Sequence, residues 1–279
     1  MLPNTFIAGV QKCGTTALHH ILAQHPDIFF PKAPQEIHFF DLDENFRKGI
    51  EWYESLFHEW NGQRIIAQTS PLYLFEPSVP TRIHAAIPGA RFIVILRNPV
   101  DRAYSHYWHE VKHGAETLSF EAALDKESER VREGFGGRRH YSYVGRGEYA
   151  TQLSRYFHLF PRERFLILRF EDLAQDLDHL LCRCADFLQV SLEGFAEARQ
   201  THGVRNSARL PRSRLAHTLA RALTKVSPRI GNAINRVNLR PVQYAPMKTA
   251  TRQLLQRRLE DEVRQTASLT GLDLGAWLR

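Results

Sequence analysis

The sequence predicts an α/β fold in which a parallel sheet is covered by helices on both faces. Short apolar runs alternate along the first 190 residues with longer segments of helical period, a pattern typical of parallel sheets. The first apolar run ends in a glycine-containing turn that leads into a helical pattern, which is the outline of a phosphate-binding loop. We therefore expect a single P-loop-like domain.

The apolar runs are rich in β-branched and aromatic residues, as strands are. The predicted strands are 5–10, 64–68, 91–96 and 164–170. The predicted helices are 15–25, 78–87, 100–112, 119–132, 147–159 and 173–189.

The alternation stops near residue 190. Residues 200–246 are rich in Arg, Ser, Asn and Pro, and they predict a long irregular or partly helical insert. A final helix over 248–267 and a tail with Leu274, Trp277 and Leu278 are expected to dock back onto the domain. The predicted single domain, 1–279, divides into a core (4–190), a variable segment (190–246) and a C-terminal helix and tail (247–279).

The composition is that of an ordinary globular protein, with 43% hydrophobic and 24% charged residues among 279. No apolar run approaches the ~18 residues of a membrane-spanning helix, and no secretory signal is evident. We expect a cytoplasmic protein without stable membrane insertion. The three cysteines, Cys13, Cys182 and Cys184, are too few for a disulfide framework, so we expect reduced thiols.

The net charge of +7 favours anionic ligands and admits nucleic acid as a partner. The arginines are spread along the chain, however, and no nucleic-acid-binding signature accompanies them. A solvated basic surface and a binding role both fit this charge. We expect no nucleic-acid partner.

The segment IAGVQKCGTTAL (7–18) carries the candidate phosphate-binding loop. Gly9 and Gly14 have the spacing of a Walker A loop, and a strand, a turn and a helix N-terminus gather backbone N–H groups around one point. A plain capped turn before a helix is the alternative. A Walker A loop would carry lysine directly after the second glycine, but here Thr15 follows it and Lys12 precedes it.

The third predicted strand ends in Arg97 rather than in the aspartate that a nucleotide kinase uses to hold magnesium. An arginine at the carboxyl end of a strand suits a second anionic group, and Ser105 follows eight residues later in a helical segment. The pattern favours two anion sites and no metal. A P-loop kinase with a degenerate loop is the alternative.

Three motifs occur in order: QKCGTTAL, PQEIHFFD and ILRNPVDRAYSHYWH. They resemble the sulfotransferases that use 3′-phosphoadenosine 5′-phosphosulfate (PAPS), most of all the heparan-sulfate branch and its bacterial relatives. The resemblance covers roughly residues 4–190, including GRGEYATQLSRYFHLFPRERFLILRFEDL. It implies PAPS as cofactor, 3′,5′-ADP as product, and no metal. Because no signal or membrane anchor is evident, we expect a bacterial cytoplasmic enzyme rather than a Golgi one.

By this resemblance Arg97 and Ser105 bind the 3′-phosphate, and the first loop binds the 5′-phosphosulfate through Lys12, Cys13, Gly14, Thr15, Thr16 and Ala17. Glu36 matches the family's catalytic glutamate, and Lys12 would stabilise the leaving phosphate. Glu36 and His38 face the same side of an extended segment, so His38 could orient the substrate or act as an alternative base. A solvated carboxylate and a packing histidine are the alternatives.

The sequence says less about the acceptor than about the cofactor. Thr69 stands where related glucosaminyl enzymes carry lysine, which puts a heparan-type acceptor in doubt. Ser70 and Tyr73 are candidate substrate-cleft residues, although Tyr73 could simply pack. The basic segment 201–214 is the candidate loop over the 3′-phosphate, through Arg205, Arg209 and Arg212. We expect the acceptor to be a hydroxyl, or less readily an amine, of a glycan, glycolipid or natural product, with 40–60 and 190–246 shaping its site.

Overall fold

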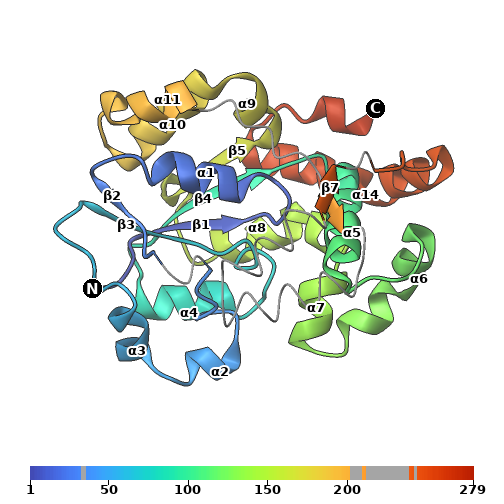
Figure 1. Ribbon diagram of the computed structural model, residues 1–279, viewed down its shortest axis with the longest axis horizontal. Coiled ribbons are helices and arrows are strands. Elements are labelled where there is room, and N and C mark those ends of the chain that lie inside the picture. The colour runs from blue at the N-terminus through green and yellow to red at the C-terminus, as the bar shows by residue number, and fades with distance from the viewer. Residues whose placement is uncertain (33–35, 202–208, 212–238, 242–243) are drawn as a thin grey trace.

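A computed structural model describes residues 1–32, 36–201, 209–211, 239–241 and 244–279. Its centre is a sheet of five parallel strands in the order β2-β3-β1-β4-β5, so the predicted α/β fold is confirmed (Figure 1). The strands are β1 (Thr5–Gly9), β2 (Ile28–Phe29), β3 (Ile65–Thr69), β4 (Arg91–Leu96) and β5 (Phe165–Arg169).

The register of the sheet brings three strand ends to one edge. Thr5 of β1 is aligned with Ala67 of β3 on one side and with Arg91 of β4 on the other. Because all three strands are parallel, the residues that follow them emerge at the same edge, where ligands bind in open α/β sheets. Every residue of β1 and β3 is buried, as expected for strands covered on both faces.

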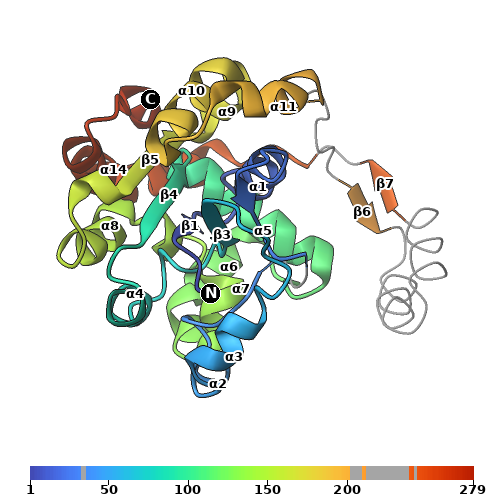
Figure 2. The ribbon, with the colours of Figure 1, turned by 90° about the vertical axis from the view of Figure 1, so that its left-hand side faces the viewer.

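Helices cover both faces of the sheet. Figure 2 shows α1 (Thr15–Leu22) and α10 (Leu177–Leu188) on one side and α4 (Val79–Ala86) and α8 (Tyr149–Phe157) on the other. The core is rich in aromatic pairs across these layers. Phe92 of β4, for example, meets Tyr156 of α8 with ring centroids 5.2 Å apart.

A second group of helices lies beyond the carboxyl edge of the strands: α5 (Pro99–His113), α6 (Phe120–Val131), α7 (Phe135–Tyr141) and α14 (Thr249–Thr270). Asn98 begins α5 by accepting hydrogen bonds from the amides of Val100 and Asp101. α14 packs against α5 and α8, and Trp277 in the tail is buried. The predicted final helix and its docking are thus confirmed.

The structure differs from the sequence prediction in several places, of which three concern the sheet and the helices around it. The predicted helix 173–189 is two helices, α9 (Phe170–Gln175) and α10, because the Asp176 carboxylate caps α10 by accepting from the amide of His179. β2 was not predicted, since two residues carry no periodic signal. α7 was not predicted either. Its Gly137 lies against the carbonyl of Arg130, where a side chain would not fit.

The remaining elements are short. They are α2 (Asp43–Phe46), α3 (Ile50–Ser55), α11 (Ala196–Thr201), the antiparallel pair β6 (Arg209–Pro211) and β7 (Leu239–Pro241), and the 3-10 turns η1 (Gly145–Gly147), η2 (Arg162–Arg164), η3 (Leu192–Phe195) and η4 (Gly275–Leu278). Most of the predicted insert 200–246 lies outside the described residues. In the described part of the chain, no helix is both long and apolar enough to cross a bilayer.

Candidate functional site

The loop between β1 and α1 is held in a defined turn. The amide of Val10 donates to the carbonyl of Ile95 on β4 (3.0 Å), and the amide of Cys13 donates back to the carbonyl of Val10 (3.1 Å). Gly14 ends the turn with a φ of 89°, and a Cβ there would lie 2.8 Å from Leu173 Cδ2. Only glycine fits this position without displacing α9.

The start of α1 presents free donors to the loop. The amides in the first turn of a helix, here those of Thr15, Thr16 and Ala17, have no partner within the helix. No side chain caps this end and no acidic residue lies in the first turn, so its partial positive charge is not compensated. An anion in the loop would supply the missing acceptor.

Cys13 belongs to the framework of the loop. Its side chain is fully buried, and burial raises the pKa of the thiol to about 12. Its amide is bonded to Val10, so neither group is free for a ligand. The sequence grouped Cys13 with its ligand-binding neighbours because it lies between them.

Two cations lie together at this edge of the sheet. The Arg97 guanidinium donates to the carbonyl of Lys12 (Nη1 to O, 3.2 Å) and lies 4.7 Å from the centre of the Phe170 ring. Burial, with the charges of Lys112 and Arg97, lowers the pKa of Lys12 to about 8. Within the described residues neither Lys12 nor Arg97 forms an ion pair. This arrangement suits a polyanionic ligand.

The structure says less about the other residues predicted to bind the 3′-phosphate. Ser105 lies half-buried on α5, and no hydrogen bond joins it to Arg97. Arg209 lies in β6, which contacts α5, but its side chain is not described. Arg205 and Arg212 lie outside the described residues.

A cavity of about 290 Å³ opens beside the loop. Its polar lining comes from the loop, α5, α7 and the segment before α2, and consists of Gln11, Glu36, His109, Glu110, His113, Arg139 and His140. Lys12 adjoins this lining, since its Nζ lies 3.3 Å from Nδ1 of His109. The cavity therefore places Glu36 and the anion-binding loop around one space.

Glu36 heads a short chain of polar groups. Its Oε2 lies 3.6 Å from Nε2 of His38, and Nδ1 of His38 lies 2.8 Å from Oδ2 of Asp41. Asp41 is buried and can only accept a hydrogen bond as a carboxylate, so His38 carries a proton on Nδ1. Its Nε2 is thereby directed at Glu36, whose side chain is 42% exposed. Sequence reasoning brought Glu36 and His38 together but missed Asp41.

Thr69 holds the backbone of Glu36 at the end of β3. The two residues form an isolated parallel bridge, and Thr69 Oγ1 lies 2.9 Å from Nδ1 of the buried His19. Burial, with the neighbouring His20, lowers the pKa of His19 to about 4, so this imidazole is neutral near pH 7. An uncharged pair thus stands at the position where the sequence resemblance predicts a lysine.

The two candidate cleft residues after β3 are both buried. Tyr73 is fully inaccessible, and its hydroxyl donates to the carbonyl of Ile37 (3.0 Å) and accepts from Nε2 of Gln68 (3.0 Å). Tyr73 therefore packs in the core, which is the alternative that the sequence left open. Ser70 is 1% exposed, and its hydroxyl has no hydrogen-bond partner.

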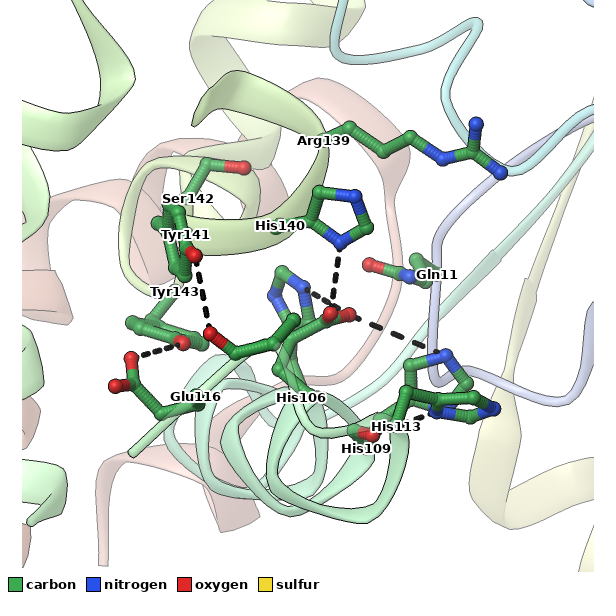
Figure 3. A network of polar contacts seen from close by, with 12 residues as sticks. Gln11, His106, His109, His113, Glu116, Arg139, His140, Tyr141, Ser142 and Tyr143 are labelled. Atoms are coloured by element: carbon green, nitrogen blue, oxygen red, sulfur yellow. Dashed lines mark hydrogen bonds and ion pairs between the residues drawn. The ribbon is translucent and has the colours of Figure 1, made fainter. Parts of the chain in front are cut away.

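The imidazole cluster on α5 was not predicted as part of the site (Figure 3). The spacing of His106, His109, Glu110 and His113 puts all four side chains on one face of a helix, and this signal was available in the sequence. Glu110 accepts a hydrogen bond from Nδ1 of His140 on α7 (2.8 Å). Among the residues that the structure describes, no group of three or more His, Cys, Asp or Glu side chains is arranged to hold a metal ion.

Comparison with known proteins finds matches to sulfotransferases. The family model described as the sulfotransferase domain matches residues 2–210. Mouse heparan sulfate glucosamine 3-O-sulfotransferase 5 is 38% identical over 173 residues, which are 60% of this chain and 47% of that protein. Human bifunctional heparan sulfate N-deacetylase/N-sulfotransferase 2 is 34% identical over 187 residues, 62% of this chain and 20% of that protein. The chain spans about half the length, or less, of these curated relatives.

A solved structure also matches along the whole chain. The crystal structure of a sulfotransferase from Alicyclobacillus acidocaldarius is 31% identical, with a TM-score of 0.74 and complete coverage of both chains.

Proposed function

Because this chain belongs to the sulfotransferase family, we propose that it transfers a sulfuryl group from PAPS to a hydroxyl of a glycan or a similar polyhydroxylated acceptor. The observation that carries the proposal is the pair of cations, Lys12 and Arg97, beside a loop whose helix-start amides have no side-chain cap. Arg97 stands where a magnesium-dependent kinase needs a metal-binding carboxylate.

The residues present fit PAPS, which when bound supplies an activated sulfuryl group. Lys12 and the amides of Thr15, Thr16 and Ala17 would hold the 5′-phosphosulfate. Lys12 would also offset negative charge that develops on the leaving phosphate, and such preorganised charge is a large term in catalysis. Arg97, with Ser105, would bind the 3′-phosphate.

Glu36 is the proposed general base. Its carboxylate lines the cavity and is accessible there, so it can accept a proton from an acceptor hydroxyl. Asp41 fixes the ring of His38, whose Nε2 lies 3.6 Å from the Glu36 carboxylate and, when the ring carries a second proton, pairs with it. His38 therefore acts as an orienting group in this proposal.

The cavity supports a sugar-like acceptor. Its volume lies near the lower end of the range for small-molecule sites, and its lining is mostly polar. The relatives reported above are named for heparan sulfate, one for O-sulfation and one for N-sulfation. A hydroxyl is the proposed nucleophile, and an amine is the alternative.

A sulfuryl-transfer assay tests this proposal. The protein is incubated with radiolabelled PAPS, EDTA and a panel of hydroxylated and amino sugars, and labelled sugar is separated from PAPS. We expect label on at least one hydroxylated sugar, and loss of that transfer in Glu36→Gln. Absence of transfer to any sugar, together with phosphate transfer from ATP when magnesium replaces EDTA, would favour the kinase instead.

A further inference from the structure

Glu110 is the centre of a buried polar cluster between the phosphate-binding loop and α7. The residue is 2% exposed. Its Oε2 lies 2.8 Å from Nδ1 of His140, and its Oε1 lies 3.5 Å from Nε2 of His106 and 4.0 Å from Nε2 of His109. Burial alone would raise the pKa of Glu110, but the contacts of its carboxylate with His106 and His140 outweigh burial and lower the pKa.

The partners fix the proton positions in this cluster. As a carboxylate, Glu110 can only accept, so His140 carries its proton on Nδ1. His109 accepts from Lys12 at Nδ1 and so carries its proton on Nε2, the nitrogen that faces Glu110. Glu110 thus connects α7, through His109, to the lysine of the phosphate-binding loop.

A second buried group anchors the same turn of α7. Arg146 is fully buried, and its Nη2 donates to the carbonyls of Arg138 (2.8 Å) and Arg139 (2.7 Å). Its Nη1 donates to the side chain of Gln11 in the loop. The carbonyls at the end of α7 are therefore satisfied by a residue that also holds the loop.

These two anchors set one wall of the cavity. Arg139 and His140 both line it, and Arg139 is exposed and forms no ion pair among the described residues. Nδ1 of His140 is occupied by Glu110, so its Nε2 is the nitrogen left for a ligand. Figure 3 shows Arg139 and His140 on the same stretch of α7, near Gln11.

On the basis of the proposed sulfuryl transfer, we propose that Arg139 and His140 select acceptors that carry an anionic substituent near the reacting hydroxyl, and that Glu110 is the residue that positions His140. Arginine pairs with a carboxylate or sulfate through two parallel hydrogen bonds, and His140 Nε2 adds a neighbouring polar contact.

Binding of two matched probes to the protein with 3′,5′-ADP tests the proposal. The probes are p-nitrophenyl β-D-glucuronide and p-nitrophenyl β-D-glucoside, which differ in one carboxylate, and calorimetry measures both. We expect the glucuronide to bind at least about tenfold more tightly, since a charge-assisted hydrogen bond contributes on the order of tenfold or more. Arg139→Ala and His140→Ala should each reduce this preference, whereas the exposed Arg132→Ala, outside the cavity, should retain it.

Glu110 is tested by two substitutions. Glu110→Gln retains an acceptor for His140 and should keep most of the preference, whereas Glu110→Ala should lose it. Both are measured at saturating 3′,5′-ADP, so that an effect of Glu110 on Lys12 does not enter the ratio of the two probe affinities. A purely structural role would lower the melting temperature and leave the preference intact. If Glu110→Ala does not fold, loss of the preference in His140→Ala still decides.

Three results would overturn the proposal. The two probes could bind equally, neither probe could bind, or the preference for the glucuronide could survive in both Arg139→Ala and His140→Ala. These outcomes are separate from the proposed function, which is tested by the binding of 3′,5′-ADP itself and by the sulfuryl-transfer assay.

Discussion

The lowered pKa of Lys12 predicts that binding of 3′,5′-ADP weakens as the pH rises above 8. Burial and two neighbouring cations lower this pKa from 10.5 to about 8 in the free protein. An anion beside the ammonium group favours its charged form, so the pKa rises again on binding. Binding above pH 8 therefore takes up a proton, and affinity falls as protons become scarce.

The size of the effect follows from the fraction of Lys12 that is charged. With a pKa of about 8, roughly 90% of Lys12 is charged at pH 7 and roughly 10% at pH 9. If the bound form stays protonated, the dissociation constant should increase about tenfold between these two pH values, which corresponds to about 1.4 kcal/mol. The phosphates of the ligand have their second pKa near 6, so they are largely ionised throughout this interval.

Titration calorimetry at several pH values, in buffers of different ionisation enthalpy, measures both the affinity and the proton uptake. Lys12→Arg keeps a charge that does not titrate, and it should give a flat profile. Lys12→Gln should bind more weakly and also without a slope. A wild-type affinity that is constant from pH 7 to 9, or a slope that persists in Lys12→Gln, would refute the reasoning.

Three further predictions concern single residues. Glu36→Gln should lower turnover by about 10²–10⁴-fold and leave the dissociation constant of 3′,5′-ADP within about twofold, as measured by steady-state kinetics and calorimetry; unchanged turnover would assign the base to another group. Gly14→Ala should lower the free energy of unfolding by about 1–3 kcal/mol, because the backbone φ at this position is 89° and the added Cβ would contact Leu173. Denaturant titration measures this free energy, and an unchanged value would contradict the prediction. Arg97→Ala should weaken 3′,5′-ADP about tenfold or more while changing 5′-ADP little, and equal losses for both would place the 3′-phosphate elsewhere.

The parts of the site that sequence reasoning found are local in the chain. The loop from Lys12 to Ala17 follows directly from a strand, a glycine and a helix start, and Arg97 follows directly from β4. Parallel pairing of β1 with β4 then brings both to one edge. The fold was predictable for the same reason, since apolar periodicity is a local property.

The parts that it missed depend on contacts between distant segments. α7 contains two consecutive glycines, which disfavour a helix, and its end is held by Arg146 from the following turn. His140 joins the site through Glu110, thirty residues earlier in the sequence. Tyr73 lies in the core because Gln68 and the backbone of Ile37 satisfy its hydroxyl, and neither contact follows from the local pattern.

The central claim is that one site holds two phosphate groups through Lys12 and Arg97. The most direct test compares the thermal stabilisation of the protein by 3′,5′-ADP and by 5′-ADP, each with EDTA and with magnesium. The account predicts a clearly larger shift in melting temperature with 3′,5′-ADP, independent of magnesium. Equal shifts with the two nucleotides, or a shift that appears only with magnesium, would contradict it.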